Sequence, residues 1–247
     1  MEHTPTQVVG TRLFNHDTLD STNNEAIRLI EEGKGEGAVV VANCQTAGRG
    51  RRGKIWKSPP GNLYLSIIFP AIGIKDGGQV AYFSAVSVGD AITSFLSKTV
   101  RIRFKWPNDL LIEQKKIGGI LIEKKDDFYV IGVGLNIIKA PTLDEGKSIS
   151  LQMVGVSTNC SSLIQEIIKK FRVWNRVWRK KGFTKIRDAW VENATGIGSR
   201  IVIKAGNGIE ERGIFMGVDK TGALHFKKDN GEKKKIFAGE IFCLENT

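Results

Sequence analysis

The stretch Gln45-Thr46-Ala47-Gly48-Arg49-Gly50-Arg51-Arg52-Gly53-Lys54-Ile55-Trp56 decides between two kinds of fold. It follows the apolar, β-branched run 38–42, which predicts a buried strand. Its glycines match GxGxxG, the pattern of the dinucleotide-binding turn, in which a helix begins at once so that its N-terminus holds the pyrophosphate. Here Lys57-Ser58-Pro59-Pro60 comes next, and such a sequence does not begin a helix of that kind. The stretch therefore argues against a Rossmann fold.

The same loop is the first candidate binding site. Between Gly48 and Gly53, glycines are interleaved with arginines. Glycines let a backbone wrap closely round a ligand, and arginine side chains bind phosphate or carboxylate in a bidentate way. The alternative interpretation is a flexible, solvated basic loop.

The segments on both sides of the loop show helix and strand periodicity. Thr22-Asn23-Asn24-Glu25 fits a capping box at the start of a helix that Gly33 would end. Apolar residues at helical spacing predict further helices over 80–96 and 162–181. Short apolar runs bounded by turn residues predict strands at 63–69, 100–104, 109–112, 119–124 and 128–135.

The pattern changes after about residue 193. Short strand candidates recur every 8–12 residues, and turn residues separate them. The predicted turns are Asn207-Gly208, Lys220-Thr221-Gly222 and Asp229-Asn230-Gly231. Four or five strands in so short a segment predict a small β-barrel, so we divide the chain into residues 1–193 and 194–247.

The composition limits the classes of protein. The 37 basic and 26 acidic residues among 247 give a net charge of +11, which favours an anionic partner. Cys44, Cys160 and Cys243 are scattered, which predicts a reducing compartment. There is no signal peptide and no apolar run of about 20 residues that could span a membrane. We therefore expect a soluble, cytoplasmic protein without a membrane partner.

Three more stretches carry candidate ligand-binding residues. Lys105-Trp106-Pro107-Asn108-Asp109 places a lysine and an aspartate across a turn, where they could face one pocket; an ordinary turn is the alternative. The segment 116–123 begins with Lys116 and a glycine pair, which lets a ligand lie flat on a strand or marks only a bulge. The segment 132–136 again has two glycines in a strand.

These stretches occur in one order, and together they resemble the biotin protein ligase family, also called biotin–[acetyl-CoA-carboxylase] ligase. The Gly/Arg loop and the run 105–109 are highly specific to that family. Lys54 is a small departure, because the family often has an arginine before the aromatic residue. The matching segments are 21–23, 45–53 with Trp56, 61–64, 105–109, 116–123, 132–136 and 217–224, so the resemblance covers essentially the whole chain.

The resemblance implies a fold and a reaction. The fold is an α+β catalytic domain with helices packed on a mixed β-sheet, like the cores of class II tRNA synthetases, followed by a C-terminal SH3-like barrel. The family activates biotin with ATP to give biotinyl-5′-AMP, and a lysine of a biotin carboxyl carrier protein domain, such as that of acetyl-CoA carboxylase, then takes the biotin. Mg²⁺ is expected with ATP, but no residue is assigned as its ligand.

The resemblance also assigns roles by position. Lys116, Arg49 and Arg51 would neutralise charge at the α-phosphate, and Asp109 would orient or deprotonate the incoming lysine. Trp56 would stack on adenine once the loop closes. The implied biotin-binding residues are Ser21, Thr22, Asn23, Gln45, Gly48, Arg49, Arg51, Lys116, Gly118 and Gly119. The implied ATP- and adenylate-binding residues are Arg51, Arg52, Trp56, Lys105, Asn108 and Asn136.

Two rival functions stay open at this point. A lipoate or octanoate ligase shares the fold, although the Gly/Arg loop and the run 105–109 favour biotin. A nucleic-acid-binding regulator would suit the +11 charge, but only about 17 residues precede Thr18, so we expect no helix-turn-helix domain and no specific DNA binding. The basic side chains of the helix 162–181 form either a solvated face or a surface for an acidic carrier domain, and homodimerisation is left open. These side chains are Arg172, Arg176, Arg179, Lys180 and Lys181.

Overall fold

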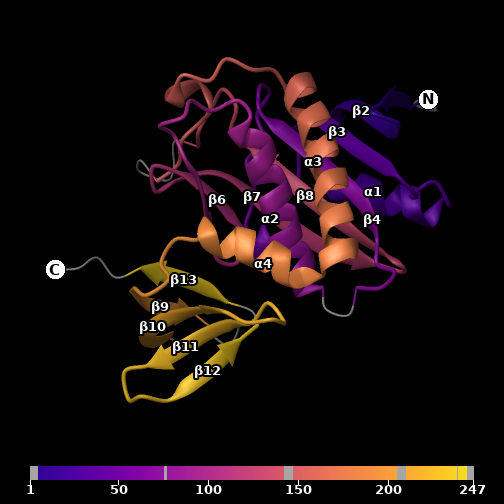
Figure 1. Cartoon of the computed structure of the whole chain (residues 1–247). Coiled ribbons are helices and arrows are strands. Elements are labelled where there is room, and N and C mark those ends of the chain that lie inside the picture. Colours follow the sequence, from indigo (N-terminus) through magenta and orange to yellow (C-terminus); the bar gives the residue numbers. More distant parts are fainter. Residues whose placement is uncertain (1–4, 75–76, 142–146, 205–209, 238, 244–247) are drawn as a thin grey trace.

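The computed structural model describes residues 5–74, 77–141, 147–204, 210–237 and 239–243. In this part of the chain, two β-sheets and four α-helices form a mixed α+β fold (Figure 1). The larger sheet has eight strands in the order β1-β2-β3-β4-β8-β7-β6-β5, and only the β2–β3 pair is parallel. Its strands are β1 (Thr6–Val8), β2 (Thr11–Leu19), β3 (Ala38–Gln45), β4 (Leu63–Pro70), β5 (Ile102–Lys105), β6 (Asp109–Ile112), β7 (Lys115–Lys125) and β8 (Phe128–Leu135).

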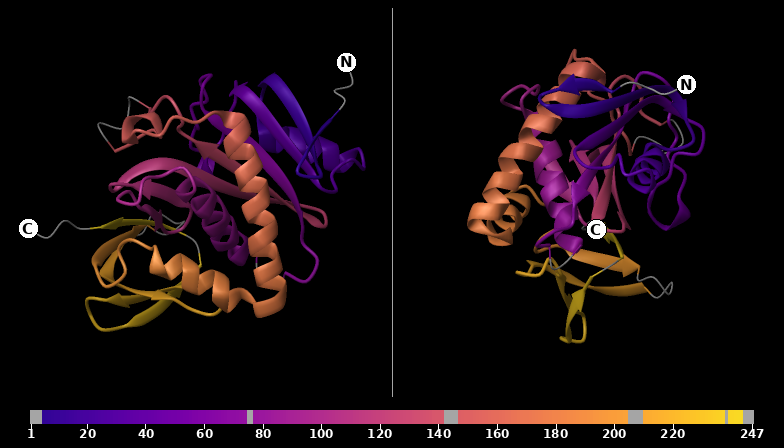
Figure 2. Two further views of the ribbon diagram at one scale, coloured as in Figure 1. Left: turned by 45° about the horizontal axis from the view of Figure 1, so that its top comes forward. Right: turned by 90° about the vertical axis from the view of Figure 1, so that its right-hand side faces the viewer.

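Both faces of this sheet are covered, because side chains alternate along each strand. In β3, Val39 and Val41 pack in the core beneath helix α2 (Gly78–Thr93), whereas Val40 packs beneath helix α1 (Thr22–Glu31). Figure 2 shows α1 on one side of the sheet and α2 on the other. The alternation also places Gly119 of β7, Gly132 and Gly134 of β8 and Ser66 of β4 on the face of α1.

A second layer of helices lies outside α2 (Figures 1 and 2). Helix α3 (Cys160–Lys181) packs along α2 through aromatic rings, such as Phe83 of α2 against Phe171 and Trp178 at 5.1 Å each. Gly182, with φ +73°, separates α3 from α4 (Phe183–Glu192). Among the described helices, none is long and apolar enough to cross a membrane.

The smaller sheet lies below α4 in Figure 1 and has five strands in the order β12-β11-β10-β9-β13. The predicted turns at 220–222 and 229–231 are confirmed, whereas Asn207-Gly208 lies outside the described residues. The Tyr82 hydroxyl of α2 donates to the carbonyl of Gly222 at 2.7 Å and accepts from Trp106 Nε1 at 3.0 Å, so it ties this sheet to the larger domain. The strands are β9 (Arg200–Lys204), β10 (Glu210–Val218), β11 (Leu224–Lys228), β12 (Lys233–Ile236) and β13 (Glu240–Cys243).

Three features differ from the sequence prediction. The hairpin β1–β2 and helix α4 were not predicted. The capping box at Thr22 was wrong: the N-cap of α1 is Ser21, without a side-chain capping bond, and Thr22 is the first helical residue. The Thr22 hydroxyl lies instead 3.2 Å from Gln45 Oε1, which also accepts from the Thr22 N–H at 2.8 Å. A partner from another strand thus replaced the local cap.

Candidate active site

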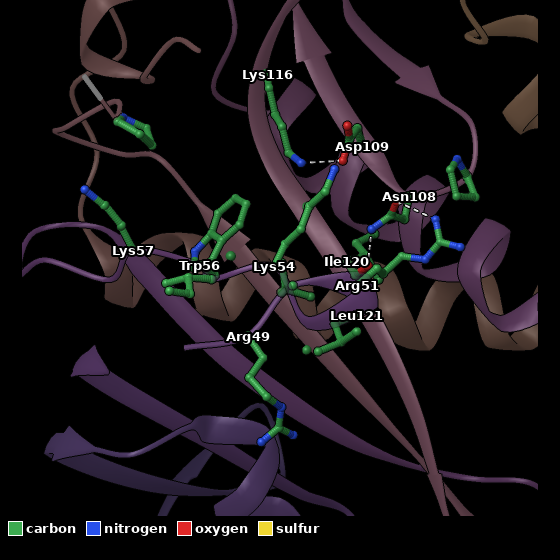
Figure 3. Close-up of a pocket in the computed structure, with 18 of the residues that line it drawn as sticks. Arg49, Arg51, Lys54, Trp56, Lys57, Asn108, Asp109, Lys116, Ile120 and Leu121 are labelled. Carbon is green, nitrogen blue, oxygen red and sulfur yellow. Dashed lines mark hydrogen bonds and ion pairs between the residues drawn. The ribbon is translucent and has the colours of Figure 1, made fainter. Parts of the chain in front are cut away.

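A cavity of about 400 Å³ lies on the α1 face of the large sheet, at the edge that faces β13 (Figure 3). The Gly/Arg loop, the start of α1, the β5–β6 turn, β7 and β8 contribute to its wall. The structure brings together these predicted residues around it: Ser21, Thr22, Asn23, Gln45, Arg49, Arg51, Trp56, Lys105, Asn108, Asp109, Lys116, Gly119 and Asn136.

Three predicted residues do not line this cavity. A Cβ on Gly118 would meet Leu135 at 2.3 Å, so Gly118 is packed inside the sheet. Gly48 lines a neighbouring cavity, and a side chain there would meet the Trp56 carbonyl at 2.5 Å. Arg52 donates to the carbonyl of Lys204 in the small sheet. The glycine spacing therefore marks close packing as well as ligand contact.

The polar end of the cavity, which we define as Ser21, Thr22, Asn23 and Gln45, is tightly hydrogen-bonded. The first three side chains are at most 4% exposed. Gln45 Nε2 donates to Ser58 Oγ at 2.8 Å, while its Oε1 accepts from the Thr22 backbone. The polar groups are therefore already oriented, as a binding site for a small polar ring requires.

Asn23 is held by two residues that the sequence reasoning did not single out. Its Oδ1 accepts from Ser66 Oγ at 2.6 Å, and its Nδ2 donates to Glu123 Oε2 at 2.6 Å. A Cβ on Gly132 would lie 2.4 Å from Asn23 Oδ1. Glycine is thus needed in β8 because the Asn23 amide lies directly on the strand.

The middle of the cavity is a flat surface formed by Gly119 and Gly134, which pair across β7 and β8. The Trp56 indole lies on it: a Cβ on Gly134 would meet Trp56 Nε1 at 2.6 Å, and one on Gly119 would meet Cζ3 at 3.4 Å. Trp56 Nε1 is buried without a hydrogen-bond partner. The surface expected to carry a ligand is therefore covered by the loop's own tryptophan.

The cationic end, which we define as Arg51, Lys105, Asp109 and Lys116, lies around the β5–β6 turn. Lys116 Nζ lies 2.5 Å from Asp109 Oδ1 and 5.4 Å from the centre of the Trp56 ring. The turn itself contains a cis Trp106–Pro107 bond, and Lys105 pairs with Asp109 across it. Two residues four apart in sequence thus face one cavity.

The loop arginines are paired with protein groups. Arg49 extends away from Lys116 (Figure 3) and donates to both carboxylate oxygens of Glu123, at 3.0 and 2.9 Å. Arg51 donates to Asn108 Oδ1 and to the Gly239 carbonyl, each at 3.3 Å. Burial, followed by the nearby charge of Arg52, holds the pKa of Arg51 below its ordinary value.

The loop is also fastened to the small sheet. Lys54 Nζ lies 2.8 Å from Glu240 Oε1 of β13, and this hydrogen bond holds the pKa of Glu240 below its usual value. On the same strand, the ring of Phe242 lies under Lys105 Nζ at 5.6 Å. The small sheet therefore forms part of the cavity wall.

Asn136 is largely structural. Its Nδ2 donates to the Ile149 carbonyl at 3.1 Å and lies 3.5 Å from that of Lys116, and the residue is 3% exposed. It therefore fixes the backbone of Lys116 while one edge faces the cavity. Within the described residues, no group of three His, Cys, Asp or Glu side chains could hold a metal ion.

The fold and the cavity define a class of protein. A sequence profile of the biotin/lipoate A/B protein ligase family matches residues 16–136, and a profile of the biotin protein ligase C-terminal domain matches residues 196–244. The bifunctional ligase/repressor BirA of Bacillus subtilis is 35% identical over 96% of this chain and 75% of its own length. The chain belongs to the biotin protein ligase family.

Two further likenesses agree with this assignment. The biotin–[acetyl-CoA-carboxylase] ligase of Paracoccus denitrificans is 32% identical over 90% of this chain and 97% of its own length. The structure of biotin protein ligase from Aquifex aeolicus in complex with biotin and ATP matches with a TM-score of 0.82 and 24% identity, covering 93% of this chain and 97% of that one. The latter likeness shows that the fold is shared.

Proposed function

We propose that the protein activates biotin with ATP to biotinyl-5′-AMP and transfers it to a lysine of a biotin carboxyl carrier protein, such as that of acetyl-CoA carboxylase. The observation that carries this proposal is one cavity with a preformed polar end and a cationic end, joined by a flat glycine surface, in a chain of this family. The polar end suits a cyclic urea, and the cationic end suits a carboxylate meeting a phosphate.

In the first step, the biotin carboxylate attacks the α-phosphorus of ATP, and pyrophosphate leaves. Both reactants are anions, so the enzyme must offset their repulsion. Lys116 Nζ lies beside the middle of the cavity, 3.6 Å from the position of a Cβ on Gly119, and its ammonium would move from Asp109 to the two reacting groups. Arg51 lies beside Asn108 on the same side and would hold the phosphate.

In the second step, the carrier amine attacks the acyl carbon of the mixed anhydride, and AMP leaves. Asp109, released from Lys116 when the latter binds the intermediate, would accept a proton from the incoming ammonium. The 2.5 Å Lys116–Asp109 pair supports this sequence of steps, because movement of Lys116 to the ligand would also leave Asp109 free to accept a proton.

The Gly/Arg loop would close over the bound ligand. A ligand on the glycine surface must displace the Trp56 indole, which is then free to stack on adenine. Closure of this loop, which glycines bound on both sides, would also exclude water from an anhydride that hydrolyses readily. Arg49, now paired with Glu123, becomes available to the ligand only if that pair changes.

The remaining parts of the proposal rest on wider features. Mg²⁺ enters with ATP and screens the polyphosphate. The exposed basic face of α3 offers a surface to an acidic carrier domain. We also place the domain boundary at 193/194, with a core like those of class II tRNA synthetases in residues 1–193 and an SH3-like barrel in residues 194–247. The separate five-stranded sheet supports this division. We locate the enzyme in the cytoplasm, which the free thiols of Cys44 and Cys160 support.

The test is pyrophosphate release from ATP. Addition of biotin should start it, and addition of lipoate should not, because lipoate has no N–H donors for the polar end. Release with lipoate alone would favour the lipoate-ligase alternative. A mobility-shift assay at moderate salt tests the nucleic-acid alternative, since nonspecific DNA binding falls steeply with salt.

A further inference from the structure

The aromatic ring of Phe242, on β13 of the small sheet, lies in the wall of the cavity and is 41% exposed. Two lysine ammoniums lie over this ring, Lys105 Nζ at 5.6 Å and Lys204 Nζ at 5.5 Å from its centre. Both are close enough for attraction by an aromatic face, which extends to about 6 Å. A ring from the small sheet therefore contacts a cation that the larger domain supplies to the cavity.

The two lysines differ in their other partners. Lys204 Nζ pairs with Glu210 Oε1 at 2.6 Å, and Lys204 does not line the cavity. Lys105 does line the cavity, and in the part of the chain that the structure describes its ammonium forms no ion pair. A carboxylate thus compensates the charge of Lys204, whereas Lys105 is held by the ring alone.

An aromatic face holds an ammonium without neutralising it. The attraction comes from the ring quadrupole, so the charge of Lys105 stays uncompensated and N–H donors remain for an anion. Lys116, by comparison, must first leave Asp109. A lysine side chain also has many rotamers, and ordering them when a ligand binds costs affinity. The ring does part of this ordering before the anion arrives.

We propose that Phe242 is a positioning residue that presents the Lys105 ammonium to the polyphosphate of ATP. The inference rests on the proposed function for the identity of the anion. The ammonium rather than the ring would contact the phosphates, so Phe242 acts through Lys105. Loss of the ring should therefore weaken the binding of ATP and leave the binding of biotin at the polar end unchanged.

The variant Phe242→Leu removes the ring and keeps an apolar side chain. The KM for ATP, measured by pyrophosphate release at saturating biotin, should rise about two- to fivefold, the effect of one exposed cation–π contact. The kcat should change less than the KM, because a contact with the polyphosphate exists before the reaction begins. Phe242→Tyr keeps the ring and should keep the KM of the wild type. Both variants should bind biotin as the wild type does, by calorimetry without ATP.

A double-mutant cycle shows whether the effect passes through Lys105. Lys105→Met should raise the KM for ATP more than Phe242→Leu does, because it removes the charge itself. In the Lys105→Met background, Phe242→Leu should change the KM less than about 1.5-fold. A ring that stacked on adenine or only stiffened the small sheet would have the same effect in both backgrounds. If Phe242→Leu does not fold, as judged by thermal unfolding, Phe242→Met replaces it in the cycle.

Two controls match the lysine and the ring. Lys204→Met removes the second ammonium over the same ring, from a residue outside the cavity lining. Phe237→Leu removes another aromatic side chain of the C-terminal region, which is 70% exposed and does not line the cavity. Both variants should leave the KM for ATP unchanged.

Four results would overturn the inference. Phe242→Leu could leave the KM for ATP unchanged, or raise it equally in the Lys105→Met background. Phe242→Tyr could lose as much as Phe242→Leu, or Lys204→Met could raise the KM as much. Each of these outcomes leaves the proposed function standing, whereas absence of biotin-dependent pyrophosphate release by the wild type would refute the proposed function and this inference together.

Discussion

The two ends of the cavity are held in different ways. At the polar end, Ser21, Thr22 and Asn23 are buried, and hydrogen bonds hold the side chains of Thr22, Asn23 and Gln45, so their orientation exists before a ligand arrives. At the cationic end, the charged groups contact other protein groups: Lys116 is paired with Asp109, Arg51 with Asn108, and Lys105 lies over the ring of Phe242. We infer that the first end recognises a ligand by fit and the second by exchange of partners.

The largest effect is expected at the cationic end, from Lys116→Ala. Loss of one charge-assisted contact of about 1.5–3 kcal/mol should slow adenylate formation about 10- to 150-fold. Pyrophosphate release measures it. Lys115→Ala is the control, because Lys115 is exposed on the same strand and should be neutral. Normal release by Lys116→Ala would remove Lys116 from the chemistry.

Arg51→Gly should affect the hold on the adenylate more than its formation. Loss of a bidentate phosphate contact should raise the dissociation rate of the adenylate about tenfold or more, while Lys116 still supports activation. Freed adenylate would biotinylate serum albumin, which a streptavidin blot detects.

The neighbouring Arg52→Gly is the matched control for Arg51→Gly. Arg52 points to the small sheet and has φ +55°, which glycine adopts freely, so albumin should stay unlabelled. If Arg51→Gly consumes ATP with biotin and also leaves albumin unlabelled, the role given to Arg51 is wrong.

Two glycine substitutions compare the polar end with the middle of the cavity. Gly132→Ala would place a Cβ 2.4 Å from Asn23 Oδ1 in the fixed network, and we expect a loss of about 1–3 kcal/mol in the free energy of unfolding. Gly134→Ala would meet the Trp56 indole at 2.6 Å, but the loop can carry the indole away, so the loss should be smaller. Urea unfolding of both variants measures the difference, and equal losses would show that the Trp56 contact is as rigid as the polar end.

The smallest effect should come from Lys54→Met, which removes the exposed pair with Glu240. Such a pair contributes about 0.2–1 kcal/mol, so amide exchange over 46–56 should accelerate less than about fivefold. Because the folded pKa of Glu240 is depressed, the contribution of Glu240 to stability is present above pH 4.5 and is lost as the pH falls below it.

Biotin and ATP together should slow amide exchange over residues 46–56, and no slowing would mean that this loop is not the lid.

Local features of the structure were predicted from the sequence more accurately than contacts between residues far apart in the chain. The strands 109–112 and 128–135 were predicted with the bounds that the structure has, because turn residues limit both. Helix α4 was missed because its ten residues follow a glycine that also ends α3. Glu123 and Ser66 were missed because their partner Asn23 is 100 and 43 residues away in sequence, and an acid in an alternating strand usually faces solvent. The capping prediction at Thr22 failed for the same reason, since a distant glutamine competed with the local bond.

The Tyr82 hydroxyl limits how freely the C-terminal sheet can be exchanged between relatives. This one oxygen joins the Gly222 carbonyl of the small sheet to Trp106, which precedes Asn108 and Asp109 of the cationic end. Gly222 has φ +92°, and a Cβ there would lie 3.1 Å from the Tyr82 ring, so a larger residue would be strained at this turn. A chimaera that takes residues 194–247 from another chain must therefore reproduce that turn, or it will loosen the turn that carries Asn108 and Asp109 even though neither residue has been replaced.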